Sequence, residues 1–208
     1  MIRVVTIARE YGSGGGSIAR MLAENLGWKL LDRDLISDLA ARVNCSPEEV
    51  ARYDEHPPSF LSRLMHAYWM GSADTWTVTP SVEILDADTL AATTGRVIEE
   101  AAQLGNCVIV GRGSQCVLAH RPDVFHAFVY APRHERVRRL LLHRHTKEDE
   151  AEAAMLDVDR IRASYVRRYH ERDWTDRHLY HLMMNSKVGD SRVVATILAA
   201  AGLAAERI

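Results

Sequence analysis

An apolar run at residues 4–8 leads through a glycine-rich turn into an amphipathic segment. In that segment apolar side chains recur at the spacing of one helical face, at Ile18, Met21, Leu22 and Leu26. Gly27 ends the pattern, as glycine commonly does just past the end of a helix. The hydrophobic positions therefore predict a buried strand, a glycine-rich turn and a helix in succession.

Four further apolar runs have the length of strands. They occupy residues 28–31, 107–110, 124–130 and 181–184. Helical patterns separate them, including residues 97–104, 132–145, the arginine-rich stretch that ends near 170, and 191–201. Short apolar strands that alternate with helices predict an α/β fold, in which helices cover both faces of a parallel sheet.

The pattern is less regular at residues 44–94, which we interpret as a helical insertion within one domain spanning 1–208. The segment 60–76 is rich in aromatic and methionine side chains. Tyr68, Trp69 and Trp76 suit stacking on a base or, as is more usual for aromatic residues on an amphipathic helix, a place in the core. The same segment suits a contact between copies of the chain, which makes a homo-oligomer possible.

The glycine-rich turn at residues 12–16 is built like a phosphate cradle. Glycines allow positive φ and close backbone approach, so several N–H groups converge on an anion at the positive end of a helix dipole. Ser17 falls in the first helical turn, where its hydroxyl caps the helix or reaches a metal ion. The alternative is a flexible connection between strand and helix.

The turn lacks the lysine of the standard phosphate loop, G-x-x-x-x-G-K-[ST]. Alignment of Ser17 with the last position of that motif puts glycine at the lysine position, and residues 1–28 contain no lysine. The charge that offsets nucleotide phosphates must then come from Arg9, Arg20 or arginines elsewhere in the fold.

Composition narrows the class of protein. A chain of 208 residues, 47% of them hydrophobic, is long enough to bury the core of one domain. The formal net charge of −2 argues against a dedicated nucleic-acid-binding protein. Cys45, Cys107 and Cys116 show neither disulfide nor zinc spacing, and no apolar stretch is long enough to span a bilayer. We expect a cytoplasmic protein with no nucleic-acid or membrane partner.

Basic residues gather at positions 133–147, where Glu135 is the single acid. Arg136, Arg139 and His143 share one helical face. Apolar residues placed to pack inward are Val137, Leu140 and Leu141. Guanidinium groups bind phosphate oxygens bidentately, so this face is a candidate polyphosphate clamp. A solvent-facing basic helix and a nucleic-acid patch are the alternatives.

Other candidates lie farther along the chain or at predicted strand ends. Asp157 and Arg160 are spaced i, i+3 and suit a prearranged pair, although the surrounding mixture of charges is typical of a surface network. Arg112, between two glycines, binds a ligand or bridges its loop. Asp32 and Asp34 suit magnesium binding through water or proton acceptance, and Asp34 equally suits a helix N-cap.

The carboxyl ends of parallel strands share one edge of the sheet, where ligands bind. We therefore expect that edge to be lined by Gly12, Asp32, Arg112 and Asn185.

Several short motifs run through the chain together. Residues 8–15 read A-R-E-Y-G-S-G-G, and further motif segments occupy 31–36, 53–55, 110–113, 131–136 and 180–186. This combination resembles the cytidylate kinase-like family, whose members typically open with S-R-E-Y-G-S-G-G. The resemblance spans nearly the whole chain. It implies a P-loop kinase fold with a five-stranded parallel sheet, an acceptor-binding insertion and an arginine-rich lid at residues 132–170.

The resemblance also implies ATP-dependent phosphoryl transfer with Mg²⁺ to a CMP-like nucleoside monophosphate or another small acceptor. The phosphate-binding set is Arg9, Gly12, Ser13, Gly14, Gly15, Gly16 and Ser17, and Ser17 is also the metal candidate. Arg136 and Arg139 match lid arginines and are catalytic candidates together with Asp34. Acceptor-binding candidates are Asp32, Arg112, Asp157 and Arg160.

The chain departs from true cytidylate kinases at several of these positions. Gly15 stands where they carry the loop lysine, Gly113 where they carry an acid, and Ser37-Asp38 where they carry a Tyr-Arg pair. Members of the kinase-like family usually carry Arg-Glu at the positions of Gly16 and Ser17. These departures bear on which acceptor the chain uses.

Three functions compete. The first is the nucleotide-dependent kinase, and the second is a binding or regulatory module that has lost transfer along with the lysine. The third is a dinucleotide-binding oxidoreductase, since Asp32 follows Gly12 by about the distance expected of a ribose-binding acid.

Overall fold

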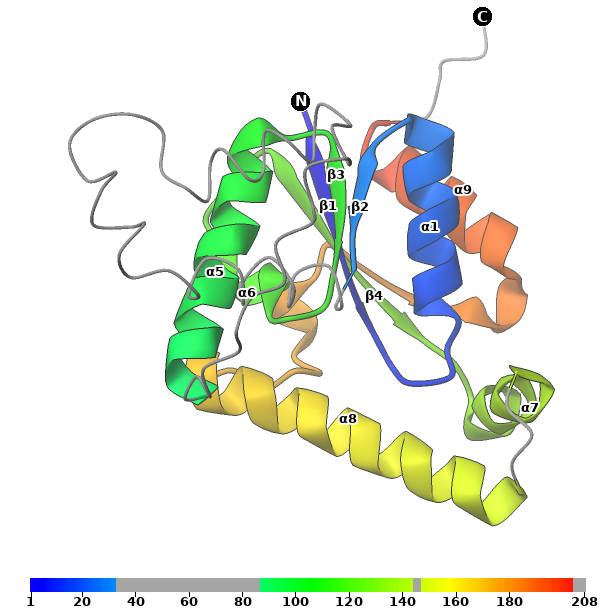
Figure 1. Cartoon of the computed structure of the whole chain (residues 1–208). Coiled ribbons are helices and arrows are strands. Elements are labelled where there is room, and N and C mark those ends of the chain that lie inside the picture. Colours follow the sequence, from blue (N-terminus) through cyan, green and yellow to red (C-terminus); the bar gives the residue numbers. More distant parts are fainter. Residues whose placement is uncertain (33–86, 144–146, 204–208) are drawn as a thin grey trace, which may run out of the picture.

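Five parallel strands form one sheet at the centre of the molecule (Figure 1). The computed structural model describes residues 1–32, 87–143 and 147–203. The strands are β1 (Val4–Arg9), β2 (Lys29–Leu31), β3 (Cys107–Val110), β4 (Val124–Tyr130) and β5 (Leu182–Asn185). Their order is β2-β3-β1-β4-β5, and every pair of neighbours is parallel. The α/β fold predicted from the alternating pattern is confirmed.

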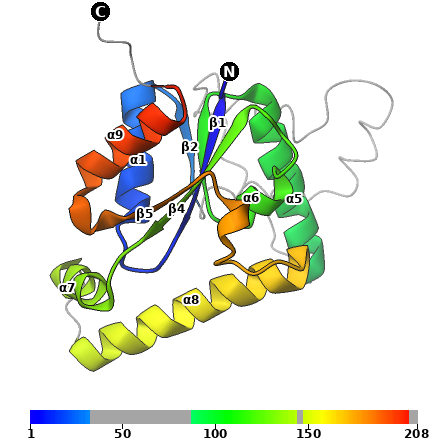
Figure 2. The ribbon, with the colours of Figure 1, turned by 180° about the vertical axis from the view of Figure 1, so that it is seen from behind.

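Helices cover both faces of this sheet (Figures 1 and 2). α1 (Gly15–Leu26) and α9 (Asp190–Ala200) lie on one face, and α5 (Ala87–Leu104) and the short α6 (Ser114–Val117) on the other. Val5 and Ile7 belong to the core cluster formed with α1 and α9, whereas Val4 belongs to the cluster formed with α5. Alternate side chains of β1 are thus buried on opposite faces, which explains its unbroken apolar run.

Helix α5 is longer than the apolar pattern predicts. It begins at Ala87 rather than near residue 97, and Thr93 and Thr94 are buried in it. Two threonines and a glycine lower the helix propensity there and interrupt the apolar pattern. The pattern therefore did not predict the first turns of α5. Residues 87–94 therefore belong to a helix packed against the sheet. The rest of the expected insertion, Tyr68, Trp69 and Trp76 included, lies outside the described residues.

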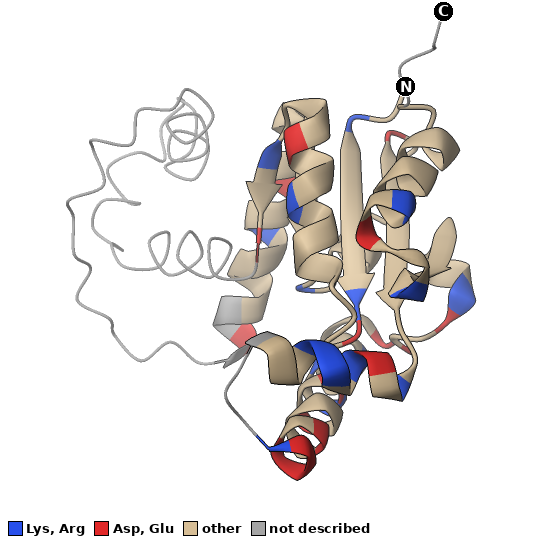
Figure 3. Cartoon of the chain, turned by 90° about the vertical axis from the view of Figure 1, so that its right-hand side faces the viewer, with Lys and Arg blue, Asp and Glu red and all other residues tan. Residues whose placement is uncertain are grey.

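Two helices lie at the carboxyl ends of the strands. α7 (Arg133–His143) follows β4, and α8 (Glu148–His170) crosses below that edge of the sheet (Figures 1 and 2). Figure 3 shows the basic residues of α7 near the acidic first turn of α8. Val137 and Leu140 are buried as expected, but Leu141 is 37% exposed, because the apolar contact of α7 with α8 uses a narrow stripe.

Two short 3-10 helices complete the described elements. η2 (Arg177–Leu179) precedes β5, and η3 (Ser186–Val188) follows it. Within the described ranges, no helix combines the length and apolar character needed to cross a membrane.

Candidate functional site

The turn between β1 and α1 has the backbone that the sequence predicts for an anion cradle. Gly12 and Gly14 adopt φ of +80° and +82°, and α1 begins directly afterwards at Gly15. A Cβ atom on Gly12 would lie 2.9 Å from the carbonyl oxygen of Arg136, so a side chain is excluded there. The first N–H groups of α1 have no acceptor within the helix and are oriented toward the carboxyl edge of the sheet.

Within the turn, Ser13 and Ser17 have different environments. Ser13 is fully buried, and its Oγ donates a hydrogen bond to the carbonyl oxygen of Glu10 at 2.8 Å. Ser17 lies exposed in the first turn of α1 beside the exposed Gly16. Ser13 therefore shapes the turn from inside, while the Ser17 hydroxyl is accessible from solvent.

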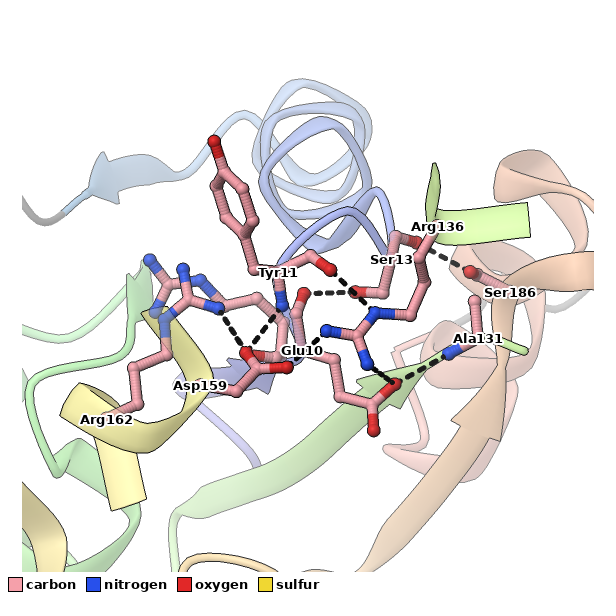
Figure 4. Close-up of polar contacts among 9 residues, drawn as sticks. Glu10, Tyr11, Ser13, Ala131, Arg136, Asp159, Arg162 and Ser186 are labelled. Atoms are coloured by element: carbon pink, nitrogen blue, oxygen red, sulfur yellow. Dashed lines mark hydrogen bonds and ion pairs between the residues drawn. The ribbon is translucent and has the colours of Figure 1, made fainter. Parts of the chain in front are cut away.

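Arg136 reaches from α7 to the glycine-rich turn (Figure 4). Its Nε donates to the carbonyl oxygen of Tyr11 at 2.7 Å, its Nη1 lies 3.3 Å from Oε2 of Glu10, and its Nη2 pairs with Asp159. The residue is only 8% exposed. In this arrangement the guanidinium holds the turn and connects it to Glu10 and Asp159.

Arg139 makes the neighbouring connection. Its Nη1 donates to the carbonyl oxygen of Ser13 at 2.8 Å, and its Nη2 lies 3.0 Å from Oδ1 of Asp190 and 3.2 Å from the carbonyl oxygen of Ser186. Ser186 Oγ also donates to the Ser13 carbonyl, at 2.5 Å. The structure thus brings both predicted lid arginines to the glycine-rich turn, where each binds a backbone carbonyl of the turn.

Asp159 and Glu10 complete this network, and sequence reasoning missed both. Asp159 accepts from the backbone N–H of Tyr11 at 2.8 Å, and Glu10 accepts from the N–H of Ala131 at 3.1 Å (Figure 4). Arg162 donates to the carbonyl oxygen of Arg9 at 2.9 Å. The signal that was present is a stripe on one face of α8, formed by Met155, Asp159, Arg162 and Val166 at helical spacing.

The predicted pair on α8 forms but faces solvent. Arg160 Nη1 lies 3.1 Å from Oδ1 of Asp157, and the two side chains are 75% and 63% exposed. They lie on the opposite side of the helix from Asp159 and Arg162. The structure does not bring this pair to the glycine-rich turn.

A cavity of about 130 Å³ lies between the carboxyl ends of β1 and β3 and helix α8. Three arginines line it: Arg9, Arg112 and Arg162. Its other walls include Tyr165 and Trp174, and burial raises the pKa of the Tyr165 hydroxyl. No carboxylate lines this cavity within the described residues, although Asp159 lies 3.4 Å from Arg162 Nη1. The cavity is therefore suited to an anionic ligand with an apolar part.

Arg9 joins the glycine-rich turn to this cavity. A Cβ atom on Gly15 would lie 2.5 Å from Cβ of Arg9, so the stem of Arg9 occupies the space where a side chain at residue 15 would begin. The Arg9 guanidinium lies against Gly111, in the loop after β3. Arg112 follows in that loop with φ of +55°, between Gly111 and Gly113. Two predicted binding residues thus come together from different strands.

The remaining predicted edge residues lie at the ends of their strands. Asp32 is exposed just after β2, and Asn185 ends β5, where its side-chain oxygen accepts from the N–H of Lys187 at 3.0 Å. Asp34 lies outside the described residues. Among the described residues, no group of three or more histidine, cysteine or acidic side chains is placed to hold a metal ion.

The strand order disagrees with the oxidoreductase alternative. In dinucleotide-binding folds β1 and β2 are neighbours, which places the acid after β2 close to the glycine-rich turn. Here β3 lies between β1 and β2. Asp32, which follows β2, is consequently separated from the glycine-rich turn by β3. The spacing of Gly12 and Asp32 along the chain does not reveal this separation.

Known structures share this fold. A protein from Eubacterium ventriosum ATCC 27560, described as uncharacterized, aligns with a TM-score of 0.71 at 20% identity over 97% of this chain and 99% of its own. A shikimate kinase from Bacteroides thetaiotaomicron aligns with a TM-score of 0.50 at 13% identity over 94% of this chain and 96% of its own. A sugar kinase from Janibacter sp. HTCC2649 aligns with a TM-score of 0.50 at 16% identity over 98% of this chain and 96% of its own.

At such low identity these structural alignments show the fold alone, and this chain shares that fold with P-loop kinases. No protein with curated annotation matches the sequence. The model of the cytidylate kinase-like family matches residues 4–188, a range that contains the glycine-rich turn, the β3 loop and both arginine-rich helices. The chain belongs to the cytidylate kinase-like family.

Proposed function

We propose that this protein is an ATP-dependent kinase that phosphorylates a small anionic acceptor, with a CMP-like nucleoside monophosphate as the first candidate. The observation that best supports the proposal is a juxtaposition at one sheet edge. A positive-φ glycine turn opens a helix there, and an arginine-lined cavity lies beside it. The turn suits the donor phosphates, and the cavity suits the acceptor.

On the donor side, we assign the phosphates to the turn from Gly12 to Ser17. The N-terminal N–H groups of α1 and the helix dipole favour an anion there. Ser17 is exposed in the first turn, so its hydroxyl fits a magnesium ligand. A magnesium ion held there would supply positive charge to offset that of the nucleotide phosphates.

Arg9 is our candidate for the charge that the missing lysine supplies in a standard loop. Its stem fills the space beside Gly15, and its guanidinium lies against Gly111, between donor turn and acceptor cavity. Arg20, the other arginine near the turn in sequence, is exposed on α1. A fixed cation between the two sites stabilises charge that develops on the migrating phosphoryl group.

On the acceptor side, we assign an anionic group of the substrate to Arg112. Asp34 keeps its proposed role as proton acceptor, and Asp32 remains a candidate at the same edge. The Asp157–Arg160 pair faces solvent, so a role in binding requires an acceptor that reaches around α8. Arg136 and Arg139 keep their proposed role on the transferred phosphoryl group, which their guanidinium groups would bind beside the turn.

The test is ATP turnover with Mg²⁺ across nucleoside monophosphates, nucleosides and small phosphorylated metabolites, with products identified by mass. We expect acceptor-dependent ADP formation. Arg9→Met, which keeps the stem and removes the charge, should lower turnover by about 10²-fold or more. The matched control Arg20→Met should leave it unchanged. Absence of acceptor-dependent ADP across the panel contradicts the kinase proposal.

A binding or regulatory module is the second candidate, and one observation favours it. Both lid arginines are engaged by carboxylates and turn carbonyls, so the chain itself offsets their charge. In that case calorimetry should show ATP binding while the acceptor panel shows no transfer.

A further inference from the structure

Arg162 lies between the arginine-lined cavity and the glycine-rich turn. It lines the cavity together with Arg9 and Arg112, and its side chain is 21% exposed. Its Nη1 atom donates to the carbonyl oxygen of Arg9 at 2.9 Å, at the residue where β1 ends. Its guanidinium carbon lies 5.8 Å from the centroid of the Tyr11 ring. One side chain therefore contacts both the cavity and the chain that leads into the turn.

Asp159 extends this contact into the turn (Figure 4). Its Oδ1 atom lies 3.4 Å from Nη1 of Arg162 and accepts from the backbone N–H of Tyr11 at 2.8 Å. Its other oxygen, Oδ2, pairs with Arg136, whose Nε donates to the carbonyl oxygen of Tyr11. The Asp159 side chain is 18% exposed, so water screens these charges less than it does at the surface. Through one carboxylate, the position of Arg162 thus affects the partners of both backbone polar groups of Tyr11.

Positive charge is concentrated at the cavity. Three guanidinium groups line a volume of about 130 Å³, and Asp159 offsets the charge of one of them. Like charges that share so small a space repel one another, and an anion bound among them relieves that repulsion. Arg162 is then held by the anion on one side and by the Arg9 carbonyl and Asp159 on the other. The glycine-rich turn, whose glycines allow many conformations, is limited to the one that these contacts favour.

We infer that Arg162 and Asp159 are positioning residues that couple the two halves of the site: an anion bound against Arg162 in the cavity fixes the turn and raises its affinity for nucleotide phosphates. This rests on the proposed function for the assignment of the turn to the donor and of the cavity to the acceptor. By linkage, the nucleotide raises the affinity of the cavity for the anion by the same factor. The ligand that binds first orders the turn, so the second ligand binds at a smaller cost in conformational entropy.

The experiment measures this coupling by calorimetric titration of the full chain. The donor probe is the β,γ-imido analogue of ATP with Mg²⁺, which cannot transfer its terminal phosphoryl group readily, and the cavity probes are CMP and ribose 5-phosphate. We expect at least one saturating cavity probe to tighten binding of the ATP analogue by about 5-fold or more, and the reverse titration to give the same factor. Competition for a single site would weaken binding, so a gain in affinity requires two sites that cooperate.

Arg162→Lys tests the residue that carries the coupling. Lysine keeps a positive charge near the cavity but lacks the planar guanidinium that contacts the Arg9 carbonyl and Asp159. We expect each ligand by itself to bind within about 10-fold of its affinity for the unmodified chain. The coupling factor should fall to about 1. The matched control is Arg168→Lys on the same helix, because Arg168 is exposed and pairs with Asp88, and this variant should keep the full coupling.

Hydrogen exchange gives a second measurement on the turn itself. The effective cavity probe, added without nucleotide, should slow exchange of the backbone amides at residues 10–14 in the unmodified chain. It should not do so in Arg162→Lys, whereas a probe that binds directly to the turn would slow exchange in both proteins. Thermal melts show whether each variant is folded.

Four results would overturn the inference. The first two are failure of both cavity probes to bind and independent binding of the two ligands. The third is unchanged exchange in the turn when the effective cavity probe binds, and none of these three requires a variant. The fourth is full coupling in a folded Arg162→Lys protein.

These readouts distinguish the coupling from the kinase activity. The coupling is measured without phosphoryl transfer, so a protein that forms no ADP with any acceptor can still show it. Conversely, acceptor-dependent ADP formation by a chain that binds the two ligands independently supports the proposed function and contradicts the coupling.

Discussion

The Nη1 atom of Arg139 donates a hydrogen bond to the carbonyl oxygen of Ser13 at 2.8 Å, across 126 positions of the sequence. This bond ties helix α7 to the glycine-rich turn. Glycines make the turn possible but leave it many conformations, so contacts from elsewhere must select one. The conformation of the turn therefore depends on a helix that lies far away in the chain.

Removing this connection should loosen the turn. Arg139→Ala deletes the bonds to Ser13, Ser186 and Asp190, and we expect a loss of about 2 kcal/mol in unfolding free energy. Turnover should fall more than stability explains, because the turn is proposed to hold the donor phosphates. The control is Arg138→Ala on the same helix. The exposed Arg138 side chain pairs with Glu135, so this substitution should change stability by less than about 0.5 kcal/mol. Urea unfolding measures the stability of both variants. Equal losses of stability would contradict the conclusion that Arg139 holds the glycine-rich turn.

Two glycines of the turn should respond oppositely to alanine. Gly14 has φ of +82°, and a Cβ atom there would overlap the Arg139 guanidinium. Gly14→Ala should therefore cost about 1–3 kcal/mol. Gly16 lies in α1 with nothing within 4 Å of an added Cβ, so Gly16→Ala should be neutral or stabilise by up to about 1 kcal/mol. Thermal melts of the two variants measure this difference. If Gly14→Ala were the more stable variant, the turn would not have the conformation described here.

Substitutions of Asp157 and Asp159, two positions apart on α8, should have very different effects on stability. Asp159 is only 18% exposed and contacts Arg136, Arg162 and the N–H of Tyr11. Asp159→Asn removes a charge that faces a buried guanidinium and should destabilise by about 2–3 kcal/mol. Asp157→Asn changes an exposed pair and should stay within about 0.5 kcal/mol. Chemical denaturation with an unchanged m-value is the measurement, and similar midpoints for the two variants would rule out the network as a stabilising element.

Stability should fall in mild acid because of His126. Burial, followed by the nearby His181, lowers the pKa of His126 to about 4. The unfolded chain has the ordinary value near 6.5, so below that pH it binds a proton that the folded chain does not. The effect is absent above about pH 6.5 and grows to about 3 kcal/mol as the pH falls toward 4.

The measurement is unfolding free energy against pH for the unmodified chain and for His126→Gln. The variant should show a shallower dependence between pH 4 and 6.5, whatever its absolute stability, since its side chain does not titrate. Parallel curves for the two proteins would assign the acid sensitivity to other groups.

Local pattern predicted the elements because each strand and helix buries an unbroken or periodic set of apolar side chains. The runs at residues 4–8, 107–110 and 124–130 became β1, β3 and β4 with nearly the expected bounds. The pattern failed at the start of α5, where Thr93 and Thr94 are buried by tertiary packing in spite of their low helix propensity. It also could not separate Asp157 from Asp159, because the mixed charges of α8 obscure which face is turned inward.

The sequence by itself determined the α/β class, the glycine-rich turn, the absence of a lysine near it and the resemblance to the family, since these depend on residues close together in the chain. Only the tertiary structure decided what surrounds the turn. It placed β3 between β1 and β2, brought Arg136 and Arg139 onto turn carbonyls, turned Asp159 and Arg162 inward, and set His170 over Gly113. Strand order and contacts between distant elements arise from packing the whole core, and periodicity along the chain carries no record of which distant side chains meet.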